Sequence, residues 1–570
     1  MKRNNLILMS ALAVGIVFSG CNPLKKMKDR GSEVKYTVNP PVLELVGNDV
    51  AITINGSYPA SYFNKKVILT LTPTLQSGDN ELAFDAYKVQ GEAVEENNKV
   101  ISSDGGTFNY SSKVAYNPDF QLSDLNLKAV GSYKAKSLDF EPYKLADGII
   151  TTCLLVEKNG KTVYASDKYV RITPDSYQTD IKYLIQKSDV RTSETKKPEI
   201  QAFTEAVKAA KANERIQFTG AQLSSYASPD GEFDLNEKLA NNREKSGQAF
   251  FMKSFKTAEV SELTQSDFLK VVATPEDWDG FKTLMEESNI ADKQLILRVL
   301  SMYSDPVVRE REIKNIAAAY DEIKAQILPQ LRRSKMTVNV ELIGLSDQEI
   351  LAQFDQDPSK LKLEEILYAG KLANDNNKKL SIYQAAARYF PSDYRTKNNL
   401  GVAYLNADRT SEAKTALNEA KSIENNDIVK TNLGVVALRE GDMAAAEELL
   451  TSVAASDEAK YNLGTIKIIE GKYSEAISYF GNQVEVNAAL AKLLAKQNDA
   501  ALSTLNSVKS DDALVYYLKA IVGARTQNTE LVMNNLRTAC TKSAALKANA
   551  RKDIEFGKYF ADNTFKSIVQ

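Results

Sequence analysis

Histidine is absent from the 570 residues of this chain. Its absence excludes Ser-His-Asp and Cys-His nucleophile systems and every histidine-ligated zinc or iron site. The sequence has three cysteines, Cys21, Cys153 and Cys540, which are too few for a four-thiolate metal cage. It also lacks a Gly-rich phosphate loop, a metal motif and a nucleophile elbow. We therefore expect a protein that is not an enzyme and that uses no cofactor and no metal.

An excess of either charge is lacking as well. Lys and Arg number 72 against 74 Asp and Glu, so the net charge is −2. A nucleic-acid-binding protein normally carries a basic field, so nucleic acid is not an expected partner. A hydrophobic fraction of 43% with 26% charged residues is ordinary for a folded protein. At roughly 100–200 residues per domain, the length predicts about three to five domains.

No apolar run reaches the roughly 20 residues that cross a bilayer as a helix. The longest run, residues 6–18, follows Lys2 and Arg3 and is typical of a signal-peptide core. It ends in Phe18-Ser19-Gly20-Cys21, which resembles the lipobox of bacterial lipoproteins, although Phe18 replaces the usual leucine. The resemblance implies a signal peptide over residues 1–20 and a palmitate-type lipid on Cys21. An ordinary secretory signal with an accidental cysteine is the alternative.

The residues after Cys21 bear on its location. No Asp follows the cysteine, which resembles lipoproteins passed to the outer membrane. Residues 25–28 are basic, whereas surface-exported lipoproteins of the Bacteroidota tend to carry acidic residues there. We therefore expect residues 21–32 to be a lipidated linker and the protein to be lipid-anchored in the outer membrane, facing the periplasm.

Residues 33–172 have the alternation of β-strands. Val50, Ile52 and Ile54 alternate with smaller or polar side chains, and residues 67–72 form a β-branched run. Asn159-Gly160 separates residues 154–157 from residues 162–164, which predicts a β-hairpin. The pattern indicates an antiparallel, β-sandwich-like region.

Residues 173–345 mix strand and helix patterns. Residues 216–226 predict a strand in which Gly220 is a candidate bulge, because the apolar phase changes there. A turn at residues 228–231 precedes a helix starting near Asp234, and residues 336–342 predict a closing strand. We expect a central α/β module whose long helical extension includes Trp278 and Phe281 as helix-packing residues.

This strand-turn-helix passage resembles the OmpA C-terminal-like fold of peptidoglycan-associated proteins. Gly231, Asn236, Leu239 and Arg243 match residues of the family's motif. In that family an aspartate and the arginine hold the zwitterionic end of diaminopimelate, but Ser228 stands in the place of the aspartate and supplies no full negative charge. A structural or protein-binding relative of the fold is therefore the favoured interpretation. The candidate peptidoglycan-binding residues are Ser228, Asp230, Asn236 and Arg243.

Residues 346–570 are helical and repetitive. Asn-Leu-Gly recurs at 399–401, 432–434 and 462–464, and each leucine is followed thirteen residues later by an alanine. This pattern resembles the tetratricopeptide repeat, in which small residues let paired helices approach closely. The resemblance implies an all-α solenoid of roughly five or six helix pairs.

Such arrays bind extended peptides or helices on their concave face. The asparagines that precede the packing leucines are placed to donate to a partner backbone, and the alternative is that they solvate the surface or bond the adjacent turn. A tyrosine in the first helix more often packs between helices than binds a partner. The candidate peptide-binding residues are Asn399, Tyr404, Asn432 and Asn462.

The three parts together resemble Bacteroidota outer-membrane lipoproteins that combine a degenerate OmpA-like module with tetratricopeptide repeats. The fold class that we expect is multidomain α+β. The expected function is that of a non-enzymatic periplasmic scaffold, whose repeats bind proteins of an envelope assembly or secretion complex. A peptidoglycan-binding tether is the alternative. Cys153 and Cys540 are expected to be buried and unpaired.

Overall fold

The computed structural model describes residues 22–257, 260–265 and 267–570. The predicted signal peptide and Cys21 lie outside these residues. The chain forms two compact units. The first unit joins the chain up to Ala165 with Phe390–Gln570, and the second is Ser166–Tyr389. Within the described residues, none of the helices combines the length and the hydropathy needed to cross a bilayer.

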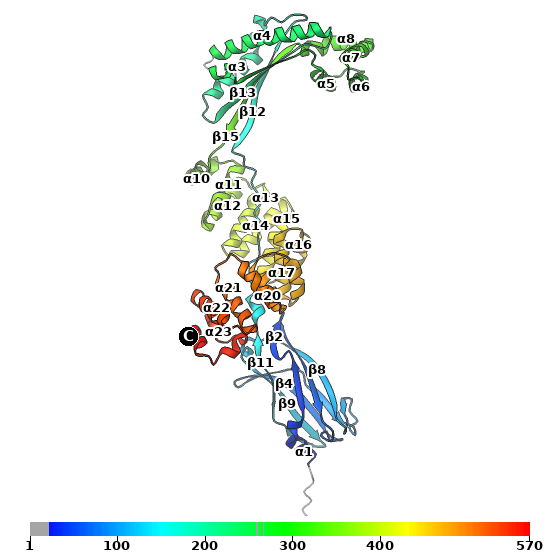
Figure 1. Ribbon diagram of the computed structural model, residues 1–570, viewed down its shortest axis with the longest axis vertical. Coiled ribbons are helices and arrows are strands. Elements are labelled where there is room, and N and C mark those ends of the chain that lie inside the picture. Colours follow the sequence, from blue (N-terminus) through cyan, green and yellow to red (C-terminus); the bar gives the residue numbers. More distant parts are fainter. Residues whose placement is uncertain (1–21, 258–259, 266) are drawn as a thin grey trace, which may run out of the picture. The chain divides into compact units, whose positions relative to one another are not determined.

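The first unit begins with α1 (Pro23–Asp29), which Asn22 caps, and continues into eleven strands. They form one sheet in the order β1-β3-β2-β11-β9-β4-β6-β7, with β8 on β3, β5 on β4 and β10 on β9 (Figure 1). The short helices η1 (Gly31–Glu33), η2 (Pro118–Phe120) and η3 (Thr152–Leu155) lie between or after the strands. The strands are β1 (Lys35–Asn39), β2 (Val42–Val46), β3 (Asp49–Tyr58), β4 (Ile68–Ser77), β5 (Asn80–Ala83), β6 (Tyr87–Gly91), β7 (Lys99–Ile101), β8 (Gly106–Ala115), β9 (Asp124–Tyr133), β10 (Lys136–Asp139) and β11 (Tyr143–Ile150).

The sheet encloses a core of its own. Val50, Ile52 and Ile54 of β3 are buried, as their alternation predicts, in one cluster with Leu71 of β4 and Leu127 of β9. Most pairings are antiparallel, but β2 with β11 and β6 with β7 are parallel. The β-rich character of this region is confirmed, and its strands belong to one continuous sheet. The predicted hairpin around Asn159-Gly160 is wrong, because residues 156–171 form no strand.

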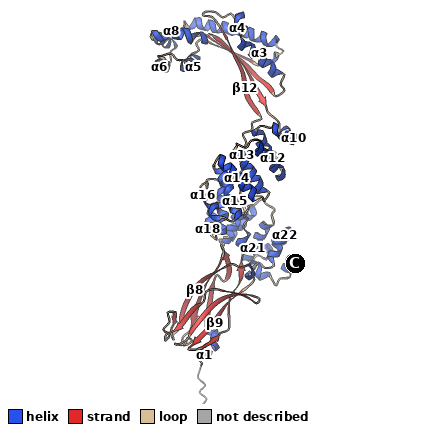
Figure 2. Ribbon diagram, turned by 180° about the vertical axis from the view of Figure 1, so that it is seen from behind, coloured by secondary structure: helices blue, strands red, loops and turns tan. Residues whose placement is uncertain are grey.

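The rest of the first unit is a series of helix pairs, which confirms the predicted repeats. Consecutive helices pack against each other from α13 to α22, and α23, η6 and α24 follow (Figure 2). Cys153 and Cys540 are buried and unpaired, as expected. The helices are α13 (Tyr394–Asn406), α14 (Thr410–Ile423), α15 (Asp427–Glu440), α16 (Met443–Thr451), α17 (Asp457–Ile469), α18 (Tyr473–Phe480), α19 (Val486–Leu494), α20 (Asn498–Ser507), α21 (Ala513–Arg525), α22 (Thr529–Lys542), α23 (Ala544–Ala550), η6 (Ile554–Tyr559) and α24 (Asn563–Val569).

Glycines set the distance between the paired helices. In three repeats the glycine of the Asn-Leu-Gly motif faces a large side chain of the second helix, and a Cβ atom at the glycine would overlap with it. The distances from such a Cβ are 2.5 Å to Leu417 Cγ at Gly401, 2.6 Å to Leu450 Cγ at Gly434 and 2.8 Å to Phe480 Cζ at Gly464. Any larger residue would push the helices apart.

The second unit contains a four-stranded sheet in the order β12-β15-β13-β14. The helices α3 and α4 pack on one face around a shared core (Figure 1). The register shifts between Phe218 and Gly220, which confirms the bulge, and the closing strand is β15. These elements are β12 (Ile172–Lys182), α2 (Thr192–Thr195), α3 (Pro198–Lys211), β13 (Ile216–Tyr226), α4 (Phe233–Thr257), η4 (Ser261–Thr264), β14 (Leu269–Thr274) and β15 (Arg333–Ile343).

A helical extension between β14 and β15 has a separate small core. Trp278 packs edge-on against the buried Phe281 there, which confirms the packing role expected of both. The extension comprises α5 (Trp278–Glu287), α6 (Lys293–Met302), α7 (Pro306–Lys314), α8 (Ala317–Gln326) and α9 (Leu328–Leu331), and after β15 the unit ends with α10 (Asp347–Gln356), η5 (Pro358–Lys360), α11 (Leu363–Leu372) and α12 (Asn376–Tyr389).

Candidate functional site

A segment of the same chain lies against α13, α15, α17 and α19 of the repeats. We call the surface that these four helices present to this segment the groove. We call residues 156–165 the strap. Four asparagines, one from each of α13, α15, α17 and α19, donate from Nδ2 to a strap carbonyl and accept at Oδ1 from the amide of the same strap residue. The pairs, with the acceptor and donor distances, are Asn399 with Ala165 (2.7 and 3.0 Å), Asn432 with Val163 (2.8 and 2.8 Å), Asn462 with Lys161 (2.7 and 2.9 Å) and Asn487 with Glu157 (2.9 and 2.8 Å).

The register of these bonds explains why the strap is not a hairpin strand. In an extended chain the amide and carbonyl of every second residue point to the same edge. Lys161, Val163 and Ala165 present that edge to the asparagines, which take the place of a neighbouring strand. Gly160 has φ +70° and changes the direction of the chain between Lys161 and Glu157, the residue that pairs with Asn487. The turn signal at residues 159–160 is therefore a bend within the strap.

All four asparagines are almost fully buried, with 0–1% of each residue exposed. Buried amide groups are normally hydrogen-bonded, and the strap satisfies both polar atoms of each side chain. The structure thus places Asn399, Asn432 and Asn462 against a polypeptide backbone, and neither in solvent nor on an adjacent turn. Sequence reasoning missed Asn487, because Ala488-Ala489 replaces the Leu-Gly that follows the other three. The one sequence feature that could have identified Asn487 is an asparagine near the start of the first helix of its pair, as in the other three repeats.

Tyr404 is not part of this arrangement. It is half-buried and packs on a cluster of helix residues that includes Val429 and Val435. The guanidinium of Arg409 lies 4.6 Å from the centre of its ring. The tyrosine therefore has the packing environment of a helix-pair residue.

Side chains add contacts at the middle of the strap. The Lys161 ammonium pairs with Glu485 and lies 4.7 Å from the centre of the Tyr461 ring. Burial raises the pKa of the Tyr461 hydroxyl well above its usual value. Arg439 Nε donates to the carbonyl of Asn159 at 2.8 Å, and burial lowers the pKa of this guanidinium. The groove therefore recognises one cationic side chain in addition to the backbone.

The chain just before the strap is held at the C-terminal end of the repeats. Thr152 Oγ1 donates to Glu555 at 2.6 Å, and Glu555 also pairs with Arg525. Next to it, Asp553 accepts a hydrogen bond from the Tyr517 hydroxyl at 2.7 Å. Burial raises the pKa of the Asp553 carboxyl to about 6. The base of the strap is thus fixed by a buried polar cluster.

A second candidate site lies in the α/β unit. The residues Ser228, Asp230, Asn236 and Arg243 line a cavity of about 60 Å³. Arg243 is 1% exposed and donates to the carbonyls of Tyr226 at 2.8 Å, Lys187 at 3.0 Å and Leu184 at 3.4 Å. Burial lowers the pKa of its guanidinium to about 10.

Arg332 completes this cavity, and sequence reasoning missed it because it lies about a hundred residues away in the chain. Its Nη2 is 3.1 Å from Asp230 Oδ2, and its Nε donates to Ser228 Oγ at 3.2 Å. Ser228 donates to Asp230, and Asn236 donates to the carbonyl of Gly231 at 3.0 Å. Each predicted peptidoglycan-binding group is therefore engaged within the unit. The charge of Asp230 is neutralised by Arg332.

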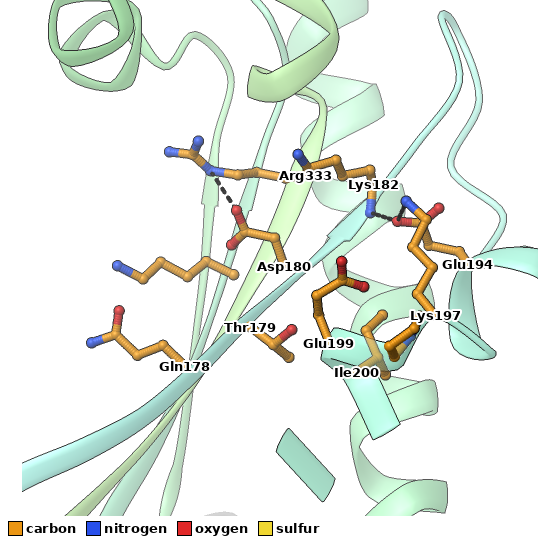
Figure 3. Close-up of a pocket in the computed structure, with 11 residues that line it drawn as sticks. Gln178, Thr179, Asp180, Lys182, Glu194, Lys197, Glu199, Ile200 and Arg333 are labelled. Carbon is orange, nitrogen blue, oxygen red and sulfur yellow. Dashed lines mark hydrogen bonds and ion pairs between the residues drawn. The ribbon is translucent and has the colours of Figure 1, made fainter. Parts of the chain in front are cut away.

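Figure 3 shows a larger cleft, of about 680 Å³, on β12 and β15 beside the start of α3. Asp180 faces Arg333 across 3.9 Å, and the buried Glu194 pairs with Lys197 at 2.8 Å. Among the described residues no group of three or more Cys, Asp or Glu side chains is arranged to hold a metal ion. The cleft offers paired charges.

Comparison with known proteins identifies the repeats. Residues 394–427 match the tetratricopeptide repeat family, and these residues include α13 and α14. The search of curated proteins gives no match. The helices after Phe390 therefore contain tetratricopeptide repeats.

Solved structures of three further proteins are similar to part of this chain. PilW, described as a widely conserved type IV pilus biogenesis factor, is 16% identical over 39% of this chain and 89% of its own, with a TM-score of 0.23. PilF of Pseudomonas aeruginosa is 14% identical over 38% and 99%, with a TM-score of 0.28. A tetratricopeptide repeat protein from Parabacteroides merdae is 13% identical over 39% and 89%, with a TM-score of 0.29.

Proposed function

We propose that this protein is a non-enzymatic scaffold that binds protein partners of an envelope assembly or secretion complex through its tetratricopeptide repeats. One observation carries the proposal. The four asparagines of α13, α15, α17 and α19 hold an extended polypeptide through eight hydrogen bonds to its backbone. Repeat arrays of this kind commonly serve protein–protein interaction.

The chemistry of the groove suits a polypeptide better than a small molecule. An asparagine side chain has one donor and one acceptor in the same geometry as a peptide group, so it can replace a neighbouring strand. Each such bond contributes about 1 kcal/mol when it is fully formed. Four successive asparagines require a ligand with a regular backbone.

The location is part of the same proposal. The signal-like residues 6–18 and the Ser19-Gly20-Cys21 sequence support an outer-membrane lipoprotein that faces the periplasm and is held by the acylated Cys21. Cys21→Ser is expected to remove lipid labelling and to release the protein from the membrane fraction. Unchanged labelling and sedimentation of this variant would reject the lipid anchor.

Site-specific photocrosslinking in native membranes tests the scaffold. A photoreactive residue at Asn406, which is exposed at the end of α13, is expected to capture the same protein in replicate experiments. The same residue at the exposed Lys113 of β8 is the matched control, and it should not capture that protein. A series of positions over α13 to α19 that captures nothing beyond the control would reject binding through the repeats.

A peptidoglycan-binding tether is the alternative, and the arrangement of the α/β unit does not favour it. Arg243 already donates hydrogen bonds to three carbonyls, and Asp230 already forms an ion pair with Arg332. A zwitterion needs a free acceptor and a free cation, and binding here would require both sets of bonds to open. Sedimentation of the protein with purified sacculi tests this alternative, as described below.

A further inference from the structure

The occupied groove suggests which partner segments fit it. The hydrogen bonds of the four asparagines to the strap all go to its backbone atoms, so they accept any extended chain. Selectivity among extended chains must come from positions where the groove contacts a side chain of the strap or leaves room only for a small residue. Three such positions lie within six residues, at Gly160, Lys161 and Ala165.

Lys161 is the position that selects charge. Its ammonium group lies between the Glu485 carboxylate and the face of the Tyr461 ring. An acidic residue here would face Glu485, and a neutral one would lose both the ion pair and the cation–π contact. The groove therefore favours lysine or arginine at this point.

Gly160 and Ala165 select size. At Gly160 φ is +70°, and a Cβ atom would lie 2.9 Å from Val435 Cγ1. Ala165 is 3% exposed beneath its bonds to Asn399. A larger residue at either point would have to displace the helices of the groove.

The strap is also separable from its surroundings. It contains no regular secondary structure, so its release breaks no strand or helix. The chain before it is held independently by Thr152 on Glu555 and by the buried Cys153, whose thiol lies 3.3 Å from the carbonyl of Leu45. These anchors, with Val156 buried in the core of the repeats, can hold the base of the strap while residues 157–165 leave the groove.

On the basis of the proposed function, we propose that the groove exchanges the strap for an extended partner segment of the same chemistry. That segment has a glycine, then lysine or arginine, and a small residue four positions after the basic residue. The strap is then an intramolecular competitor. Because it is tethered, its effective concentration is in the millimolar range, and a free segment gains access mainly when the strap is weakened.

The test uses a labelled peptide with the sequence of residues 156–165 and the full-length protein. Gly160→Val with Lys161→Glu weakens the strap through the two selective positions. This double variant is expected to bind the peptide at least tenfold more tightly than the wild type. Adding Asn432→Ala and Asn462→Ala should abolish the binding, because two of the four backbone contacts are removed.

Modified peptides test the register. Methylation of the amide that corresponds to Lys161 removes the donor to Asn462 and is expected to weaken binding at least tenfold. Methylation at the Thr162 position is the matched control, because none of the four asparagines bonds to that residue. Equal loss with both peptides would overturn the proposed recognition.

Hydrogen exchange on the wild-type protein keeps the proposal testable if the double variant does not fold. Millimolar peptide should accelerate exchange of the Val163 and Ala165 amides, and a peptide with glutamate in place of the lysine should not. Unchanged protection would overturn the exchange. A folded double variant whose Val163 and Ala165 amides exchange rapidly, but which binds no peptide, would also overturn it. Photocrosslinking at the repeats distinguishes these failures from failure of the scaffold itself.

Discussion

The groove of the repeats and the Arg243 cavity of the α/β unit both contain side chains that the sequence nominates for binding. Apart from Tyr404, these side chains are hydrogen-bonded within the chain in both places, and most of them are buried. In the groove one backbone segment meets four equivalent asparagines in regular register. In the cavity a single arginine meets three carbonyls, and Asp230 meets a second arginine. The backbone of another extended chain can form the same bonds to the asparagines, whereas the hydrogen bonds of Arg243 and Asp230 depend on the particular groups that surround them.

Arg243→Ala is expected to have the largest effect. It leaves three carbonyls without a donor and opens a cavity, so we expect the free energy of unfolding of the α/β unit to fall by about 3–5 kcal/mol. Urea unfolding measures the loss. The exposed Arg298 of α6 is the control, and its alanine variant should stay within about 0.5 kcal/mol of the wild type.

Sedimentation with purified sacculi tests whether the Arg243 cavity binds peptidoglycan. We expect no specific retention of the wild-type protein, because the charges of the cavity are already paired. Retention that is lost in a folded Asp230→Asn variant would show that the network opens for ligand and would restore the tether.

Asn462→Ala is expected to cost about 2–4 kcal/mol. The change removes two hydrogen bonds and leaves the amide and carbonyl of Lys161 without partners in the groove. Thermal unfolding and amide exchange of the strap measure it. Asn418 is exposed on α14, and Asn418→Ala should leave both measurements unchanged. An equal effect of the two variants would contradict the role of the buried asparagines.

The buried cluster at the base of the strap predicts a pH dependence. Because burial raises the pKa of Asp553 to about 6 from an ordinary 3.8, its neutral form is favoured in the folded state. This group's contribution to stability is therefore present at about pH 4 and is lost as the pH rises through 6, by about 2–3 kcal/mol. The difference between the wild type and Asp553→Asn, followed by urea unfolding from pH 4 to 8, should show this trend. A constant difference would contradict the raised pKa.

Gly434→Ala tests the packing behind the groove and should cost about 1–3 kcal/mol. The added methyl group would lie 2.6 Å from Leu450 Cγ, so α15 and α16 must separate. A methyl group added at Gly557 of η6 would meet no atom within 4 Å, and this glycine has no positive φ, so Gly557→Ala is the matched control. Similar melting temperatures for both variants would show that the helices of the repeat adjust freely.

The smallest effect is expected at the Lys161–Glu485 pair. The lysine side chain is 37% exposed, so solvent screening limits the pair to about 0.2–1 kcal/mol. A double-mutant cycle with Lys161→Glu and Glu485→Lys should show this coupling, and it should decrease at high salt. A coupling that is independent of salt would indicate a contribution other than the ion pair.

Local patterns predicted a large part of the fold. The repeats follow from apolar spacing and from glycines that face Leu417 and Leu450, which are short-range features. The Gly220 bulge follows from the change of apolar phase along one strand. The candidate asparagines were found for the same reason, because they occupy one position in a repeated motif.

The errors have a common physical cause. The Asn159-Gly160 signal favours a hairpin when only neighbouring residues are considered. The actual partners of this segment are side chains 234 to 330 residues away. Arg332 was missed because it meets Asp230 only after β15 has paired with β13.

The sequence by itself determined which segments become helices or strands and which asparagines recur, because those properties depend on propensity and periodicity. Only the tertiary structure decided what the asparagines bind and whether Arg243 and Asp230 are available. A side chain's hydrogen-bonding capacity is written in its residue type, but burial forces it to be satisfied by whichever group the fold brings within reach.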